Sequence, residues 1–363
     1  MKILHIITTL EMGGAEKLVV DMLPRLRDKD CDVELLTLSG KKTPLYSTLE
    51  QTGVKIHHFG EQTRVYDPRN ILRLVFFLKK HHYDIVHTHN TASQMFSAVA
   101  RVLCSVVLCT TEHNTSNRRR NWKWYKPIDR WMYSQYKKVI CISDSTESNL
   151  RNFIGDWSDK VCTIYNGIDV ELYANALPLE KIKITPPRKV VAMVAGFRYQ
   201  KDQETVIRSL RNLPDNVELW LVGDGSRRPV VEQCIRDCAL EDRVRLLGVR
   251  RDVPAILKSV DVVVQSSHWE GFGLAAAEAM AAGKPVVASD VEGLSQVVKG
   301  AGLLFPLGDD KALSDIICHL LSDSGFYASV AQKCQQRARE FDISKTIDRY
   351  LAVYNDIIKK KES

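Results

Sequence analysis

The chain has 363 residues, a length that predicts two domains of ordinary size. Hydrophobic residues make up 45% and charged residues 26%, as in globular proteins, and no apolar run reaches the roughly 20 residues that a membrane span needs. The sequence therefore predicts no membrane-spanning helix. The net charge of +7 equals the excess in residues 117–138, which hold eight basic residues and one acidic residue.

Strand-like and helix-like segments alternate along the chain, which is typical of parallel α/β sheets. The first half predicts strands near residues 3–8, 33–38, 54–59, 84–89, 106–111, 139–143 and 161–165. The second half predicts them near residues 189–194, 217–222, 244–247, 261–266, 285–289 and 302–305. Three prolines between the halves indicate a linker, and the last residues predict an amphipathic helix.

The N-terminal residues fit a first buried strand better than a signal peptide. The nine scattered cysteines form no disulfide or metal pattern, so we expect reduced thiols and a cytoplasmic protein.

A glycine-rich turn, TLEMGGAE at residues 9–16, follows the first predicted strand and begins a helix. Gly13 and Gly14 would let the backbone approach a phosphate or an acceptor sugar closely. A plain strand-to-helix turn would have a similar sequence.

Three histidines lie at predicted strand ends, His87 and His89 in VHTHN and His113 in TTEHN. Histidines in such places are more often packed or hydrogen-bonded than functional. His113 differs because the basic segment follows it directly, and His89 is a weaker candidate.

The basic segment also contains Trp and Tyr, a composition that suits an anionic membrane surface or a lipid-linked acceptor. We expect such contacts from Arg118, Arg119, Arg120, Trp122, Lys123 and Trp124. The alternatives are a solvated helix whose aromatic residues pack inward, and a nucleic-acid contact, which no accompanying module supports.

Residues 196–202, GFRYQKD, follow the first strand of the second half. A departing diphosphate accumulates negative charge, which a cation pair such as Arg198 and Lys201 would stabilise.

Residues 261–290 predict a strand, a glycine-bearing turn, a helix and a strand, with Glu270 and Glu278 on either side of the start of the helix. Gly271 and Gly273 lie where unpaired helix N–H groups and the helix dipole favour an anion. The pattern suits a sugar attached to a diphosphate.

At these residues the chain resembles the retaining glycosyltransferases of family 4, whose E-x7-E signature matches Glu270 and Glu278. The resemblance covers nearly the whole chain and implies the GT-B fold, an α/β architecture of two facing Rossmann-like domains with parallel sheets and an inter-domain cleft. It implies an N-terminal acceptor-side domain at residues 1–174, a linker at 175–188 and a C-terminal nucleotide-sugar-binding domain at 189–343. A helix at about 344–361 would pack back on the first domain.

The resemblance also implies roles for single residues. Lys201 matches the family lysine, but the family arginine five positions earlier is Gly196 here. Arg198 either takes its place or is a solvated surface residue. The catalytic residues that we expect are His113, Glu270, Lys201 and Arg198.

The donor-binding residues that the resemblance implies are Gly13, Gly14, Gly271, Phe272, Gly273, Leu274, Glu278, Val249 and Arg250. Glu270 would contact the sugar hydroxyls and Glu278 the ribose. Glu292 and Gln296 replace a glycine and a glutamate of the family pattern, and we expect this departure to bear on donor specificity.

These features predict a metal-independent retaining hexosyltransferase that moves a sugar from a nucleoside diphosphate sugar to a hydroxyl acceptor, in bacterial cell-envelope, capsular or exopolysaccharide synthesis. We expect no cofactor, because the metal-type string Asp28–Lys29–Asp30 lies in a polar turn. The expected partners are the donor, a glycan or lipid-linked acceptor and the inner face of the plasma membrane, with no nucleic acid. The alternatives are a nucleotide-sugar epimerase of the same fold and a non-catalytic, basic membrane-binding protein.

Overall fold

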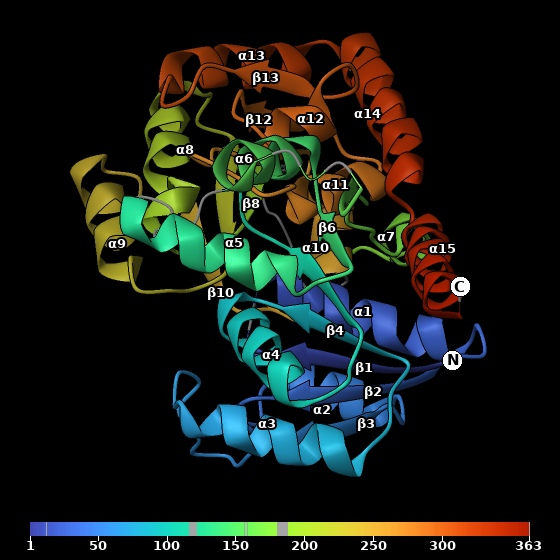
Figure 1. Ribbon diagram of the computed structural model, residues 1–363. Helices are drawn as coiled ribbons and strands as arrows, with labels where there is room; N and C mark the ends of the chain where they lie inside the picture. Colours follow the sequence, from blue (N-terminus) through green and yellow to red (C-terminus); the bar gives the residue numbers. More distant parts are fainter. Residues whose placement is uncertain (12, 116–121, 156, 158, 180–187, 363) are drawn as a thin grey trace. The chain divides into compact units, whose positions relative to one another are not determined.

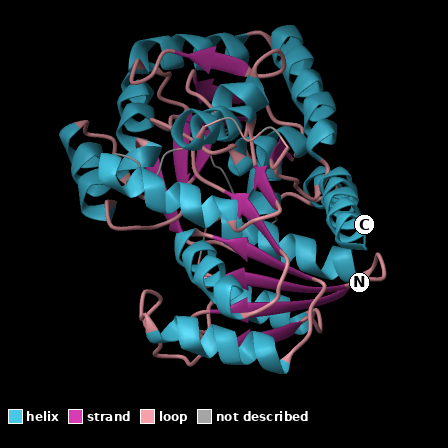
Figure 2. Ribbon diagram, viewed as in Figure 1, coloured by secondary structure: helices cyan, strands magenta, loops and turns pink. Residues whose placement is uncertain are grey.

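The computed structural model describes the chain except residues 12, 116–121, 156, 158, 180–187 and 363, and except the side chains of residues 123 and 360–362. The chain forms two compact units. The first unit comprises Met1–Gly167 and Ile343–Ser363, and the second comprises Ile168–Asp342. Each unit is an open parallel sheet with helices on its faces (Figures 1 and 2).

The sheet of the first unit has the strand order β3-β2-β1-β4-β5-β6-β7, and all its pairs are parallel. Its strands are β1 (Lys2–Ile7), β2 (Asp32–Thr37), β3 (Lys55–His58), β4 (Ile85–His89), β5 (Leu108–Glu112), β6 (Lys138–Cys141) and β7 (Val161–Thr163).

Two hydrophobic cores cover the two faces of this sheet. One core joins alternate strand residues to α1 (Gly14–Arg27), α2 (Pro44–Gln51) and α15 (Ile343–Glu362). The other joins the opposite set of strand residues to α3 (Arg69–Lys80), α4 (Thr91–Leu103), α5 (Lys126–Ser134) and α6 (Asp144–Ile154). A short 3-10 turn, η2 (Lys123–Tyr125), precedes α5. The C-terminal helix is thus a core element of the first unit, because Tyr350 and Tyr354 are fully buried.

The sheet of the second unit has the strand order β10-β9-β8-β11-β12-β13, again with parallel pairs. Its strands are β8 (Lys189–Val194), β9 (Val217–Val222), β10 (Val244–Gly248), β11 (Val262–Gln265), β12 (Val286–Ser289) and β13 (Leu303–Phe305). Every predicted strand of the chain is therefore found, with shifts of one or two residues at some ends.

The helices of the second unit are α7 (Val170–Ala174), α8 (Gln203–Ser209), α9 (Arg228–Asp237), α10 (Val253–Ser259), α11 (Leu274–Ala281), α12 (Leu294–Val298), α13 (Asp310–Ser322) and α14 (Ser324–Ala338). Its 3-10 turns are η3 (Tyr199–Lys201), η4 (Leu210–Asn212) and η5 (Arg339–Phe341). Helix α11 is buried almost all round, which its run of alanines permits.

The chain passes from the first unit to the second between Gly167 and Ile168, earlier than the expected domain boundary after residue 174. Helix α7 packs against α10 and α11, so the second unit already begins at Ile168. An isolated parallel bridge joins Ile168 to Asp342, the last residue of the second unit. Most of the expected linker, residues 180–187, lies outside the described part of the chain. None of the described helices is both long and apolar enough to cross a membrane.

Candidate active site

The predicted site residues of each unit follow strands of its sheet. In a parallel sheet the carboxyl ends of the strands share one edge, where ligands of such folds bind. In the first unit Gly13 follows β1 and His113 follows β5; in the second Lys201 follows β8 and Glu270 follows β11. Each unit therefore gathers its own set of predicted residues at one edge of its sheet.

Lys201 and Glu270 form an ion pair in the second unit. The ammonium group of Lys201 contacts Oε1 of Glu270, which also accepts a 2.7 Å hydrogen bond from Oγ of Ser267. Both charged side chains are largely buried, so solvent screens the pair only weakly. The structure thus brings two predicted residues together and adds Ser267, which the sequence did not single out.

Two hydrogen bonds hold the η3 turn against the loop that carries Glu270. The amide of His268 donates to the carbonyl oxygen of Gln200, and the Gln200 side-chain amide donates to the carbonyl oxygen of Trp269, both at 2.8 Å. The ring of Tyr199 stacks on that of His268, with centroids 4.7 Å apart. These contacts fix the position of Lys201 relative to Glu270.

The N-terminus of α11 follows Glu270 directly. Gly273 is the N-cap residue, with φ 92° and ψ 51°, and it supplies no capping side chain. Glycine adopts this left-handed conformation without the strain that a Cβ would add. The positive end of the helix dipole and the first helix N–H groups are therefore left to a ligand rather than to a side-chain cap.

The turn before α12 packs closely on this loop. Gly293 has φ 80°, and a Cβ there would collide with the carbonyl oxygen of Glu270. The close contact between this turn and the Glu270 loop therefore requires the glycine at position 293. Glu292, which stands in place of another family glycine, is exposed, and Gln296 is half-buried in α12.

The remaining predicted residues near α11 have different surroundings. The ring of Phe272 is buried edge-on against Phe341, with centroids 5.2 Å apart, so only the backbone of Phe272 can face a ligand. Glu278 lies in the second turn of α11 and is buried. Leu274 begins the helix and is half-buried.

The side chain of Arg198 lies beside Gly196. A Cβ added at Gly196 would lie 3.8 Å from Nε of Arg198 and 3.6 Å from the carbonyl oxygen of Asp224, both ordinary contact distances. The arginine therefore folds back over the position that the family arginine would occupy, although its side chain is exposed.

Val249 and Arg250 follow β10. Val249 is exposed, as a residue that borders a nucleotide base could be. The guanidinium of Arg250 is held by the Asp252 carboxylate, with nitrogen to oxygen distances of 2.6 and 2.8 Å. The cation is thus already paired within its own loop.

In the first unit the glycine-rich turn meets the end of β4. Gly13 is the extended N-cap of α1, and a Cβ there would collide with the Glu16 carboxylate. The Asn90 amide donates to Oε1 of Glu16 and to Oγ1 of Thr8, both at 3.2 Å. Asn90 has φ 69° and ψ 156°, a strained backbone of the kind that gathers at functional sites. Sequence reasoning missed Asn90; its place directly after the two histidines was the available signal.

His113 lies just beyond β5 and contacts a second histidine. Its Nε2 is 3.0 Å from Nδ1 of His89. Burial lowers the pKa of His113 to about 4, so the ring is neutral at physiological pH. Its Nδ1 is also buried and has no hydrogen-bond partner among the described residues. A neutral imidazole with one unpaired nitrogen can bind a hydroxyl group.

The basic aromatic segment is only partly described, because Arg118, Arg119, Arg120 and the side chain of Lys123 lie outside the described residues. Its aromatic residues divide into two groups. Tyr133 and Tyr136 are buried, as a helix with inward-packed rings requires. Trp122 and Trp124 are exposed and stack on each other, with centroids 5.7 Å apart.

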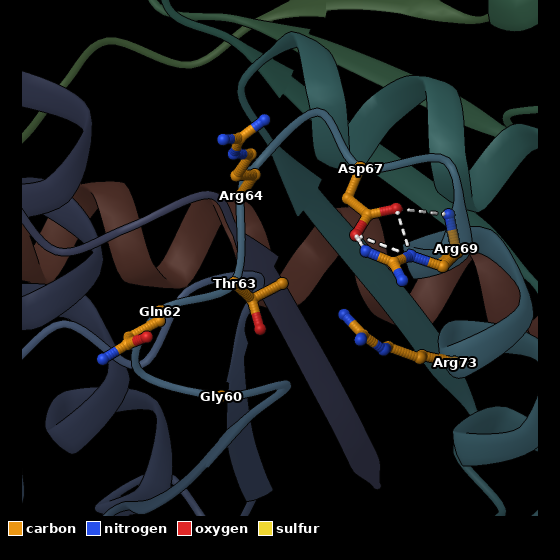
Figure 3. Close-up of a pocket in the computed structure, with 7 residues that line it drawn as sticks. All are labelled: Gly60, Gln62, Thr63, Arg64, Asp67, Arg69 and Arg73. Atoms are coloured by element: carbon orange, nitrogen blue, oxygen red, sulfur yellow. Dashed lines mark hydrogen bonds and ion pairs between the residues drawn. The ribbon is translucent and has the colours of Figure 1, made fainter.

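A pocket of about 410 Å³ lies in the loop between β3 and α3 (Figure 3). Arg64, Arg69 and Arg73 line it, and Asp67 holds the Arg69 guanidinium at 2.8 Å. None of the predicted site residues lines this pocket. Among the described residues, no group of three His, Cys, Asp or Glu side chains is placed to hold a metal ion.

Comparison with known proteins shows the class of protein that this fold and these residues define. Across 98% of the chain, the structure matches that of Anabaena HepE in complex with UDP and glucose, with a TM-score of 0.86 and 23% identity over 100% of that chain. It also matches WaaG, a glycosyltransferase involved in lipopolysaccharide biosynthesis, with a TM-score of 0.76 and 15% identity over 98% of this chain and 99% of that one. The fold is therefore GT-B, as predicted.

Sequence comparison gives the family. Residues 12–172 match the family described as Glycosyltransferase Family 4, and residues 179–341 match Glycosyl transferases group 1. An uncharacterized glycosyltransferase of Methanocaldococcus jannaschii, MJ1607, is 30% identical over 71% of this chain and 71% of its own. The UDP-Gal:alpha-D-GlcNAc-diphosphoundecaprenol alpha-1,3-galactosyltransferase of Escherichia coli is 27% identical over 99% of this chain and 98% of its own. The chain belongs to family 4 of the retaining glycosyltransferases, enzymes that transfer a sugar from a nucleotide sugar.

Proposed function

We propose that the enzyme transfers a hexose from a UDP-sugar to a hydroxyl group of a lipid-linked glycan, in bacterial cell-envelope, capsular or exopolysaccharide synthesis. The name of the Escherichia coli relative includes both UDP-Gal and a diphosphoundecaprenol acceptor, and HepE was crystallised with UDP. The observation that carries the proposal is the ion pair of Lys201 and Glu270 beside the uncapped start of α11.

In this proposal the second unit binds the donor. Lys201 and the first N–H groups of α11 neutralise the diphosphate, and Glu278 binds the ribose diol. Once the phosphate is bound, Lys201 shares its charge with it, and the Glu270 carboxylate accepts hydrogen bonds from the sugar hydroxyls. As the bond between the sugar and the phosphate lengthens, the same dipoles stabilise the charge that develops on the leaving oxygen.

For the transfer step we propose a front-face route. The bond from the anomeric carbon to the phosphate oxygen breaks, and the acceptor oxygen forms its bond on the same face of the sugar. The leaving phosphate oxygen takes the acceptor proton. In this proposal His113 accepts a hydrogen bond from a substrate hydroxyl group.

A comparison of UDP with UMP tests the assignment of Lys201. Lys201→Met should weaken the binding of UDP about tenfold or more, because it removes a partly buried cation, equivalent to about 1.4 kcal/mol. The binding of UMP should change less, because UMP lacks the second phosphate. Isothermal titration calorimetry measures both affinities.

Lys299→Met, at an exposed lysine of the same unit, is the control and should leave both affinities unchanged. Equal losses for UDP and UMP would contradict the assignment of Lys201 to the diphosphate. Incubation with a UDP-sugar alone distinguishes the transferase from an epimerase, because only an epimerase would form its product without an acceptor.

Turnover should not need a divalent metal ion, because Lys201 and the α11 dipole carry the charge of the diphosphate. We therefore expect the rate in EDTA to equal the rate in magnesium or manganese, measured as UDP release. A strict requirement for either metal would contradict this part of the proposal.

The first unit also offers a membrane-binding surface. Exposed apolar side chains lie on α3, on the C-terminal end of α4, and on η2 and α5; they are Leu72, Phe76, Val102, Leu103, Trp122, Trp124, Ile128 and Trp131. Helices α3 and α4 are in contact, and so are α4 and α5. Exposed basic residues, such as Lys79, Lys80 and Arg130, lie on the same helices. Such a surface supports binding at the inner face of the plasma membrane.

A further inference from the structure

A line of histidine rings runs through the first unit from His113 to the C-terminal helix. Nδ1 of His89 is 3.0 Å from Nε2 of His113, and Nε2 of His89 is 3.0 Å from Nδ1 of His5. The remaining nitrogen of His5, Nε2, is 3.5 Å from the hydroxyl oxygen of Tyr354 on α15. His5 and His89 lie on adjacent parallel strands, β1 and β4, and their ring planes are within 15° of each other.

The same tyrosine hydroxyl has a closer partner, Nδ1 of His87 at 2.6 Å. The other nitrogen of His87 is 2.8 Å from the hydroxyl of Thr111, which is 2.9 Å from the hydroxyl of Tyr350. This branch leads away from His113. The hydroxyl of Tyr354 therefore contacts both His87 and His5, and only His5 belongs to the line of rings that ends at His113.

All four rings are neutral. Burial lowers the pKa of His5 to about 3 and that of His113 to about 4, and it holds the pKa values of His87 and His89 well below their usual range. A neutral imidazole has one N–H group. Each nitrogen-to-nitrogen contact needs one donor, so His5, His89 and His113 must all carry the proton on Nε2 or all carry it on Nδ1.

Tyr354 decides between these two arrangements. A phenol donates a hydrogen bond to a neutral imidazole more readily than it accepts one, and His87 at 2.6 Å is a much closer acceptor than His5 at 3.5 Å, so we assign the tyrosine proton to His87. Its oxygen then presents a lone pair to His5, which must carry its proton on Nε2. Because the three rings must carry their protons on the same nitrogen, His89 and His113 are also protonated on Nε2.

We propose that Tyr354 and His89 are positioning residues that hold His113 as its Nε2–H tautomer, so that Nδ1 of His113 accepts a hydrogen bond from a substrate hydroxyl. Nδ1 is the buried atom that has no partner among the described residues. An unpaired buried acceptor costs free energy, which a bound hydroxyl group would recover. The proposal rests on the proposed role of His113 in the transferase reaction.

The tautomer can be measured directly by nitrogen-15 NMR of the full chain with labelled histidine, with His113 assigned from the signals that His113→Asn removes. We expect the Nε2–H tautomer in the wild-type protein. Tyr354→Phe should let His113 populate the Nδ1–H form, because the oxygen that accepts from His5 is lost. Tyr350→Phe is the matched control, since it removes a buried hydroxyl one turn away on the same helix and should leave the tautomer of His113 unchanged.

Kinetics test whether the reaction uses this tautomer. His89→Phe keeps an aromatic ring but breaks the line, and it should lower kcat about tenfold with little change in UDP affinity. His89→Gln restores a carbonyl acceptor toward His113 and an amide donor toward His5, so it should recover part of the rate. A general structural defect would show no such recovery.

Two results would overturn the proposal at different points. An Nδ1–H tautomer of His113 in the wild-type protein would show that the line does not set it, even if the variants fail to fold. The expected tautomer with an unchanged kcat in His89→Phe would show that the line exists but that the reaction does not depend on it. The second result would remove His89 and Tyr354 as positioning residues, and it would leave the proposed role of His113 and the donor site of the second unit intact.

Discussion

Gly196 stands where the family pattern has an arginine, and Arg198 follows two positions later. A Cβ at Gly196 would lie 3.8 Å from Nε of Arg198, and the backbone of Gly196 does not have a positive φ. Position 196 can therefore accept a side chain, and Arg198 already occupies part of the space that this side chain would need. This arrangement supports the interpretation that Arg198 supplies the missing cation.

An exchange of the arginine between these positions tests the interpretation. Arg198→Ala should weaken UDP binding about tenfold, equivalent to about 1.4 kcal/mol, because a charge-assisted contact to phosphate is lost. Adding Gly196→Arg to that variant should restore most of the affinity, since the two side chains share one space. Wild-type affinity in Arg198→Ala would instead identify a solvated surface residue.

Single residues were predictable where a local sequence motif fixes their place. Glu270 and Lys201 follow strands that the hydrophobic pattern defines, and the structure pairs them. The line of His5, His89 and Tyr354 was not predictable in this way. The line forms because β1 and β4 are neighbours in the sheet and because α15 turns Tyr354 toward them. No local sequence pattern encodes either of these tertiary contacts.

The exposed apolar residues of α3, α4, η2 and α5 belong to separate elements, and the proposed membrane-binding surface depends on the packing of these helices on one sheet face. Sequence reasoning found the part after β5 from its charge, whereas it did not single out the apolar positions on α3. Phe76 is 71% exposed even though Val75 and Leu78 of the same helix are buried. Whether a long amphipathic helix exposes such a residue depends on what packs against it.

Vesicle binding tests this surface. Phe76→Glu should lower partitioning onto vesicles rich in anionic lipid about tenfold, because a buried phenyl ring contributes about 1.5–3 kcal/mol. Leu307→Glu, at an exposed leucine of the second unit, should have no effect. Sedimentation with vesicles measures both, and equal binding of Phe76→Glu and wild type would exclude α3 from the surface.

The neutral, buried histidines make the stability of the whole protein depend on pH. Below their ordinary pKa of about 6.5, histidines of the unfolded chain take up protons, whereas the folded rings of His5 and His113 stay neutral until about pH 3 and pH 4. The unfolded state is therefore favoured as the pH falls. Each such ring should cost up to about 1.4 kcal/mol per pH unit over this range.

Urea unfolding at several pH values between about 7 and 5 measures this dependence. His5→Phe should give a smaller loss of stability with falling pH, because one buried ring no longer titrates. His82→Phe, at an exposed histidine of the same unit, should retain the wild-type slope. An unchanged slope in His5→Phe would contradict the assignment of the effect to the buried line.

Helix α15 also has a consequence for synthesis on the ribosome. The second unit is complete in the nascent chain once Asp342 has been added, but the first unit, although it begins earlier, still lacks part of its core. The part of its apolar sheet face that α15 covers stays open until translation reaches Tyr354 and Ile357. The half of the enzyme that is synthesised first can therefore reach its native state only after the other half has been made.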